Sequence, residues 1–132
     1  MTPIFVDTSG LYAVIDRDDA NHPRAASIWP NLVKQCSLVT NNYVLVETAA
    51  LLQFRLGTAA VRAFANDLLP LLEVEWVTEE DHAAAWQALL AAARRKLSFV
   101  DCVSFHSMRG RGLQKVFCFD AHFREQGFET IP

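Results

Sequence analysis

The stretch MTPIFVDTSG, residues 1–10, decides the fold and places the first candidate functional residue. Ile4-Phe5-Val6 is a short run of β-branched and aromatic residues, which is typical of a buried strand. Asp7 follows at once, and Thr8-Ser9-Gly10 is suited to opening a helix. A carboxylate therefore stands at the carboxyl end of the predicted first strand. In open α/β sheets, ligands bind at that edge.

The rest of the chain alternates predicted strands with predicted helices. Strands are expected at 3–6, 37–40, 73–77, 115–119 and 128–131. Helices are expected at 9–16, from Asn21 to or through Pro30, at 43–56, from Thr58 to near Pro70, over 79–96, at 99–109 and at 121–126. Asn41-Asn42 is expected to form a turn. The alternation predicts a three-layer α/β/α sandwich with a mainly parallel central sheet, and residues 1–132 are expected to form a single domain.

The composition excludes several classes of protein. A hydrophobic fraction of 52% and a charged fraction of 20% exclude a disordered chain. The formal net charge of −3 provides no global basic field, so nucleic-acid binding would have to rest on a local patch or a metal. Three cysteines without CxxC spacing predict free thiols. Because no signal peptide or membrane-spanning stretch is recognisable, we expect a cytoplasmic protein with no membrane partner.

Four acidic residues could meet at one edge of the predicted sheet: Asp7, Glu47, Asp101 and Asp120. Asp120 repeats the context of Asp7, since it follows an apolar run and precedes a predicted helix. Asp101 stands three residues after Ser98, at the start of another helix. Each aspartate also has a purely structural interpretation, because Asp commonly caps a helix and S-x-x-D can be a capping box.

Glu47 is the most informative of the four acids. On a helix, five apolar residues fall within about 60° of it: Tyr43, Val44, Ala50, Leu51 and Phe54. A glutamate at the centre of an apolar stripe is expected to be buried. A buried carboxylate costs several kcal/mol unless it is paired, protonated or bound to a metal. A functional role is one explanation, and a pairing with Arg55 or with a buried lysine is the other.

A cluster of carboxylates is chemically suited to a hard cation. Mg²⁺ and Mn²⁺ take oxygen ligands, whereas carboxylates without a cation repel one another and raise each other's pKa. A bound cation can lower the pKa of a water and neutralise charge on a phosphate. The sequence therefore predicts one Mg²⁺ or Mn²⁺ site. The pairs Cys102/His106 and Cys118/His122 do not have the ligand pattern of a zinc site.

The same residues resemble the four motifs of the PIN-domain nucleases. The matching segments are VDTSG at 6–10, the helical Glu47, SFVDCVSF at 98–105 and FDAHF at 119–123. They stand in the order and spacing of that family, and the size resembles that of its VapC-type toxins. One position departs from the pattern, because Cys118 stands where many relatives carry Ser or Thr. A thiol is a poor hydrogen-bond donor, so weaker metal binding or a lower rate is expected.

The resemblance implies that the four acids surround Mg²⁺ or Mn²⁺ and that the protein is an endoribonuclease. Water would attack the phosphorus in line and leave 5′-phosphate and 3′-hydroxyl ends. Asp7, Asp101 and Asp120 would hold the metal and its waters, while Glu47 would orient or deprotonate the attacking water.

The resemblance also implies supporting residues and partners. Thr8 and Ser9 would support the first acid. The implied partners are an RNA substrate, a cognate antitoxin and a second copy in a homodimer. The helices at 43–56 and 58–69 would form walls of the groove that takes the antitoxin.

Two other functions stay open at this point. A PIN-like module that binds RNA or protein without cutting is compatible with the sequence pI near 5.7 and with Cys118. A phosphatase or phosphoacceptor domain would use Asp7 as its nucleophile. The haloacid-dehalogenase type of nucleophile motif has a second Asp two residues on, where this chain has Ser9. The complete set of four acids favours the nuclease.

Overall fold

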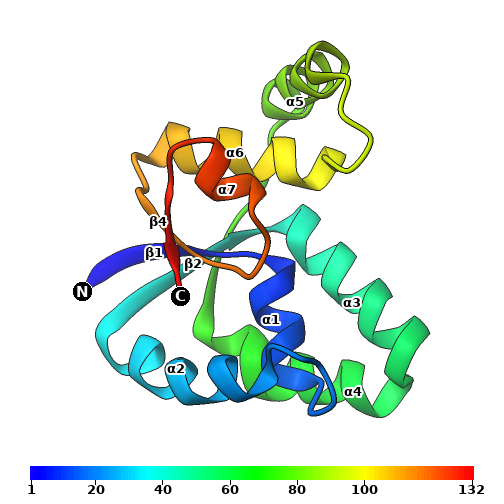
Figure 1. The fold of residues 1–132 in the computed structure, drawn as a ribbon, viewed down its shortest axis with the longest axis vertical. Helices are drawn as coiled ribbons and strands as arrows, with labels where there is room; N and C mark the ends of the chain where they lie inside the picture. The colour runs from blue at the N-terminus through cyan, green and yellow to red at the C-terminus, as the bar shows by residue number, and fades with distance from the viewer.

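A parallel five-stranded sheet forms the centre of the molecule (Figure 1). The structure, a computed structural model, describes residues 1–132. The strands are β1 (Thr2–Val6), β2 (Cys36–Asn41), β3 (Leu72–Glu75), β4 (Lys115–Phe117) and β5 (Glu129–Ile131). Their order across the sheet is β3-β2-β1-β4-β5, and every neighbouring pair is parallel.

Helices cover both faces of this sheet (Figure 1). One layer contains α1 (Thr8–Ile15), α2 (His22–Gln35), α3 (Asn42–Leu56) and α4 (Thr58–Ala63), and the other contains α5 (Glu79–Ala92), α6 (Phe99–Arg111) and α7 (His122–Glu125). The predicted three-layer α/β/α sandwich is therefore confirmed. None of the helices is both long and apolar enough to cross a membrane.

The first strand is the middle strand of the sheet. Ile4, Phe5 and Val6 are completely buried, as their apolar run predicted. The chain leaves β1 towards β2, whereas β4 pairs with the opposite edge of β1, with Val6 aligned to Phe117. This is a topological switch point, where the carboxyl ends of two neighbouring strands open a crevice. Asp7 stands at that point, and its backbone N–H donates to the Phe117 carbonyl at 3.1 Å.

Gly10 allows α1 to approach β4 closely. A Cβ atom at this position would lie 2.6 Å from the Phe117 ring and 2.8 Å from the Phe117 carbonyl oxygen. Only glycine leaves room there, so VDTSG is a packing motif as well as a source of a carboxylate.

Several element ends differ from the sequence prediction. Helix α2 continues through Pro30, so this proline does not end it. The segment from 58 to 71 is α4 followed by a π-helical stretch, Phe64–Leu68, and a short 3₁₀ turn, Leu69–Leu71. The prediction that Arg94, Arg95 and Lys96 complete the last turn of a helix is wrong. Helix α5 stops at Ala92, because Ala93 takes a left-handed conformation with φ of 49°.

Candidate active site

Three aspartates converge at the switch point of the sheet. Asp7 follows β1, Asp120 lies in the loop after β4, and Asp101 lies in the first turn of α6. One carboxylate oxygen from each lies within 4.8 Å of the other two. Asp7 and Asp101 are buried and Asp120 is half-buried. All three line a cavity of about 390 Å³, which we call the carboxylate pocket.

Each of the three carboxylates is held by hydrogen bonds to one of its oxygens. Asp7 Oδ2 accepts from the Ser9 backbone N–H at 3.2 Å and from the Ser9 hydroxyl at 2.8 Å. Asp101 Oδ2 accepts from the Ser98 N–H at 3.2 Å. Asp120 Oδ1 accepts from the His122 N–H at 3.0 Å. The second oxygen of each accepts no hydrogen bond within the chain and is available to a ligand.

The structural interpretations of the aspartates are correct for two of the three. Asp7 is the N-cap of α1, and Asp101 forms a complete capping box with Ser98 at the start of α6. Asp120 does not cap a helix, because Ala121 is the N-cap residue of α7. Asp7 and Asp101 therefore cap helices and also belong to the cluster, since the cap bond fixes the direction in which each carboxylate points.

Burial and mutual repulsion disfavour charge on these carboxylates. Burial, and then the charge of Asp120, raise the pKa of Asp7 to about 8. Burial also raises the pKa of Asp101, against the effect of its hydrogen bond from Ser98. No cationic side chain forms an ion pair with any of the three. An all-oxygen set of close, unpaired acids fits a hard divalent cation, which would supply the missing positive charge.

Ser9 joins the two halves of the site. Its hydroxyl donates to Asp7 and accepts from the Phe119 N–H at 3.0 Å, so it ties the end of β1 to the loop that carries Asp120. Cys118, in contrast, is buried, and its thiol makes one hydrogen bond, which it donates to the Asp120 backbone carbonyl at 3.8 Å. The hydroxyl hydrogen bonds in this region are thus made by Ser9, because the thiol of Cys118 is a poor hydrogen-bond donor.

Thr8 acts on α3 rather than on a carboxylate. Its hydroxyl donates to the Val44 carbonyl at 3.4 Å and accepts from the Thr48 hydroxyl at 3.2 Å. These buried bonds hold α1 against α3, the helix that carries Glu47. Thr8 is therefore positioned to support the site through the packing of two helices.

Glu47 lines the carboxylate pocket but lies outside the group of three aspartates. The expectation that it is fully buried in an apolar stripe is wrong, because Glu47 is only half-buried and Phe54 is 90% exposed. The buried positions of α3 are instead Val44, Thr48 and Leu52. The alternative pairing with Arg55 is also absent, since the Arg55 guanidinium lies over the Tyr12 ring, 5.2 Å from its centroid.

The pocket also contains residues that sequence reasoning missed as site residues: Tyr12, Arg55, Lys96 and His122. The sequence did contain a signal for Arg55, because it stands eight residues after Glu47 and therefore on the same side of α3. Lys96 stood out only as part of a basic cluster. Cationic side chains therefore line the pocket together with the aspartates.

Asn41 sets the position of α3 relative to α6. The expected turn at 41–42 is wrong, because Asn41 ends β2 and caps α3, where its Oδ1 accepts from the Val44 N–H at 2.9 Å. Its amide nitrogen donates to the hydroxyls of Ser104 and Ser107 at 3.3 and 3.2 Å. The residue is fully buried, so these bonds couple the helix of Glu47 to the helix of Asp101.

Comparison with known proteins identifies the family. The PIN domain model matches residues 4–129. The 23S rRNA-specific endonuclease VapC20 of Mycobacterium tuberculosis is 41% identical over 129 residues, which are 97% of each chain. The crystal structure of M. tuberculosis VapC20, a sarcin–ricin loop cleaving toxin, superposes with a TM-score of 0.85. That match has 40% identity and covers 95% of each chain.

A more distant structure shares the fold alone. VapBC2 from Rickettsia felis, solved with a DNA fragment from its promoter, has a TM-score of 0.71 at 11% identity, over 98% of each chain. Together, the motifs, the parallel sheet with its acidic switch point and these matches show that this chain belongs to the PIN-domain family.

Proposed function

We propose that this chain is an endoribonuclease that hydrolyses RNA phosphodiester bonds with Mg²⁺ or Mn²⁺, as the toxin of a toxin–antitoxin pair. The observation that carries the proposal is the convergence of three aspartates, each with one oxygen that accepts no hydrogen bond. The 41% identity to a 23S rRNA-specific endonuclease supports RNA as the substrate and makes 23S rRNA the first RNA to test. No observation favours the inactive binding module, since all four acids are present in one pocket.

The roles of the acids follow from their positions. Asp7, Asp101 and Asp120 would hold the cation and its waters. When bound, the cation supplies a Lewis acid that activates water and neutralises charge on the phosphate. Glu47 faces the same pocket from α3, outside the group of three. There its carboxylate would orient the attacking water and accept its proton as the bond from phosphorus to the 3′ oxygen breaks.

The cations of the pocket wall would bind the RNA backbone. Arg55 and Lys96 line the carboxylate pocket from α3 and from the loop between α5 and α6. Phosphate groups on either side of the scissile bond need positive partners, and the net charge of −3 provides none at long range. These two side chains would therefore position the strand across the aspartates.

The exposed apolar side chains suit protein partners. Phe54 is 90% exposed on α3, and Trp76, which directly follows β3, is 72% exposed. Large exposed apolar side chains of this kind are common at protein interfaces. We propose a homodimer and a cognate antitoxin as these partners, and light scattering of the purified protein tests the dimer.

Cleavage of ribosomal RNA tests the proposed function. Purified protein is incubated with ribosomes in Mg²⁺, in Mn²⁺ and in EDTA, and primer extension along 23S rRNA maps any break. The proposal expects one metal-dependent break with a 5′-phosphate end. If 23S rRNA stays intact while another RNA is cleaved, the proposed nuclease activity is upheld and 23S rRNA is rejected as its substrate. Intact RNA of every kind would reject the nuclease.

A further inference from the structure

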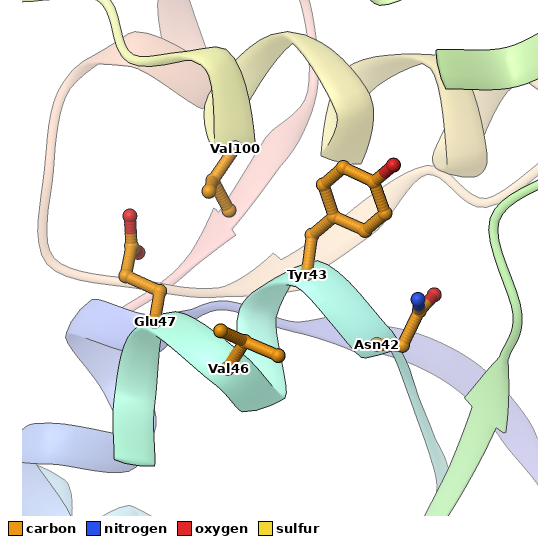
Figure 2. A pocket seen from close by; sticks show the side chains of 5 residues that line it. All are labelled: Asn42, Tyr43, Val46, Glu47 and Val100. Atoms are coloured by element: carbon orange, nitrogen blue, oxygen red, sulfur yellow. The ribbon is translucent and has the colours of Figure 1, made fainter. Parts of the chain in front are cut away.

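A second cavity adjoins the carboxylate pocket. It has a volume of about 360 Å³ and is lined by Asn42, Tyr43, Val46, Glu47 and Val100 (Figure 2). Its size lies near the low end of the range of about 300–1,000 Å³ for ligand sites. Glu47 lines this cavity and the carboxylate pocket alike, so the two are neighbours on either side of this residue. A group that fills the second cavity would lie beside the aspartates.

The walls of the second cavity are apolar and aromatic. Figure 2 shows Tyr43, Val46 and Glu47 rising from α3, with Val100 of α6 on the opposite side. Val46 is 69% exposed, so an apolar side chain is left open to solvent at this point. No cationic residue lines the cavity. The lining therefore suits a flat, uncharged ring and not a phosphate group.

Contacts within the chain hold the aromatic wall in place. The Tyr43 ring packs against His82 and Phe99, each with centroids 5.8 Å away, and its hydroxyl is hydrogen-bonded to His82 Nδ1. Trp86 Nε1–H donates to His82 Nε2 at 3.1 Å. Because an indole N–H can only donate, His82 Nε2 accepts, and Nδ1 of the neutral ring carries the hydrogen that it donates to Tyr43. Stacking on Tyr43 would then cost little side-chain ordering.

Asn42 places a free hydrogen-bond donor in the wall. Its Oδ1 accepts from the Val77 N–H at 2.8 Å, which fixes the orientation of the side-chain amide. Its amide nitrogen donates no hydrogen bond within the chain, while the residue lines the cavity. The nitrogen is therefore available to an acceptor on the edge of a bound ring.

We infer that this cavity binds one nucleobase of the RNA, that of a nucleotide adjoining the scissile phosphate. The inference rests on the proposed function, because a phosphate held at the aspartates brings a neighbouring base to Glu47. Proteins recognise unpaired RNA bases by stacking on aromatic side chains and by hydrogen bonds to base edges. Here the base stacks on Tyr43 between Val46 and Val100, and Asn42 Nδ2 donates to an acceptor on its edge. The cavity thus contributes to the choice of cleavage site.

Abasic substrates and a cavity-filling variant test the base site together. The substrate is a synthetic RNA hairpin of the sarcin–ricin loop, with an abasic ribose at each loop position in turn. Wild-type kcat/KM is expected to fall about 5- to 150-fold for one position beside the break, which is the range that one base–aromatic contact contributes. Val46→Trp fills the cavity, so its kcat/KM on the intact hairpin should fall below that of the wild type by a similar factor. On the hairpin that is abasic at this position, the variant and the wild type should have the same kcat/KM.

Leu90→Trp is the matched control. Leu90 has the same 69% exposure as Val46 but lies on α5, outside both cavities, so its variant should cleave every hairpin as the wild type does. The base site is overturned if the wild type cleaves all abasic hairpins as fast as the intact one. It is also overturned if Val46→Trp cleaves the intact hairpin at the wild-type rate. A segment of a protein partner would then be the better candidate to occupy the cavity.

A fluorescence measurement separates failure of the base site from failure of the nuclease. The hairpin carries 2-aminopurine at each loop position in turn and is bound to Asp101→Asn, which is expected not to cleave. Stacking on Tyr43 quenches the fluorescence at one position, and adding Val46→Trp to this variant restores it. Quenching would uphold the base site even if the wild type cut no RNA. Absence of quenching at every position of a bound hairpin would overturn it.

Discussion

Each clustered aspartate uses its two carboxylate oxygens for different purposes. In Asp7 and Asp101, one oxygen bonds to the backbone at the start of a helix and so fixes the side chain, while the other stays open to the pocket. The structural interpretation of D-T-S and S-x-x-D is therefore correct, and it leaves one oxygen of each carboxylate available for the proposed functional role. A short polar motif predicts both, because the bond that caps the helix also aims the carboxylate.

Metal binding is expected to strengthen as the pH rises. Asp7 keeps its proton up to a pH of about 8 in the metal-free protein, since burial and Asp120 raise its pKa. A cation must displace that proton, so calorimetric titration with Mn²⁺ should give a higher affinity at pH 8.5 than at pH 6. The heat should also vary with the ionisation enthalpy of the buffer. Equal affinities at the two pH values would contradict this account.

The stability of the metal-free protein is expected to fall over the same range. The pKa of Asp7 is 3.8 in its ordinary state and about 8 in the folded chain. Between these values the folded state keeps a proton that the unfolded state releases, so the free energy of unfolding falls as the pH rises. The slope is at most about 1.4 kcal/mol per pH unit. Urea unfolding at pH 5.5 and pH 8 measures it, and Asp7→Asn should remove most of the difference.

At the scale of the element, two buried contacts hold the helices that carry the acids. Gly10 lets α1 lie against β4, and Asn41 joins the start of α3 to α6. Thr8 adds a bond between α1 and α3. The relative position of Asp7, Glu47 and Asp101 therefore depends on packing residues that take no part in the chemistry.

Gly10→Ala is expected to destabilise the protein by about 1–3 kcal/mol. The added Cβ would lie 2.8 Å from the Phe117 carbonyl oxygen, a backbone atom that cannot rotate away. The start of α1 must shift, so Mn²⁺ binding should weaken as well. Gly110→Ala is the control, because nothing lies within 4 Å of its added Cβ and the position is inside α6. That change should be neutral or stabilising by up to about 1 kcal/mol, and an equal loss in both variants would refute the packing argument.

Asn41→Ala is expected to cost about 2–4 kcal/mol of unfolding free energy, because it removes a helix cap and leaves buried hydroxyls without a partner. Chemical denaturation measures the loss. Asn66→Ala changes an exposed asparagine whose side chain makes no hydrogen bond within the chain, and it should stay within about 0.5 kcal/mol of the wild type. A small effect at Asn41 would mean that the contact between α3 and α6 does not depend on this side chain.

The sequence predicted element types better than element faces and ends. The alternation of strands and helices was sufficient for the α/β/α sandwich, because periodicity is local. The prediction of which face of α3 is buried was wrong, because this helix packs against α1, α4 and α6. Its hydrophobic residues are therefore spread around it, and Phe54 is exposed. The predicted end of α5 was wrong because Ala93 takes a left-handed conformation there, and alanine is not a residue that normally ends a helix.

At the scale of the whole molecule, the site is a product of topology. Asp7 and Asp120 could be predicted to meet because each follows a strand, and parallel strands end at one edge. The place of Lys96 in the pocket and the second cavity could not be predicted, since both depend on how α3 lies against α6 and its preceding loop. Such contacts between distant elements leave no local pattern in a single sequence.

Glu47→Gln is expected to separate chemistry from metal binding. Glu47 lies outside the group of three aspartates, so its amide variant should keep its Mn²⁺ affinity and its melting temperature. The loss of a proton acceptor should lower kcat by about 10²–10⁴-fold, the usual contribution of general base catalysis. A matching loss of Mn²⁺ affinity, measured by calorimetry, would instead make Glu47 a direct ligand.

The most direct test of the central claim is the rate of RNA cleavage as a function of Mn²⁺ concentration, for the wild type and for Asp120→Asn. Asp120 is chosen because it is not the N-cap residue of a helix, and because asparagine keeps the Oδ1 atom that accepts from the His122 N–H, so we expect the folded elements to stay intact. The account predicts a saturable dependence on Mn²⁺ for the wild type, no cleavage in EDTA, and a large loss of rate in the variant at every concentration. Cleavage in EDTA, or an Asp120→Asn variant as active as the wild type, would contradict the claim that these aspartates form a catalytic metal site.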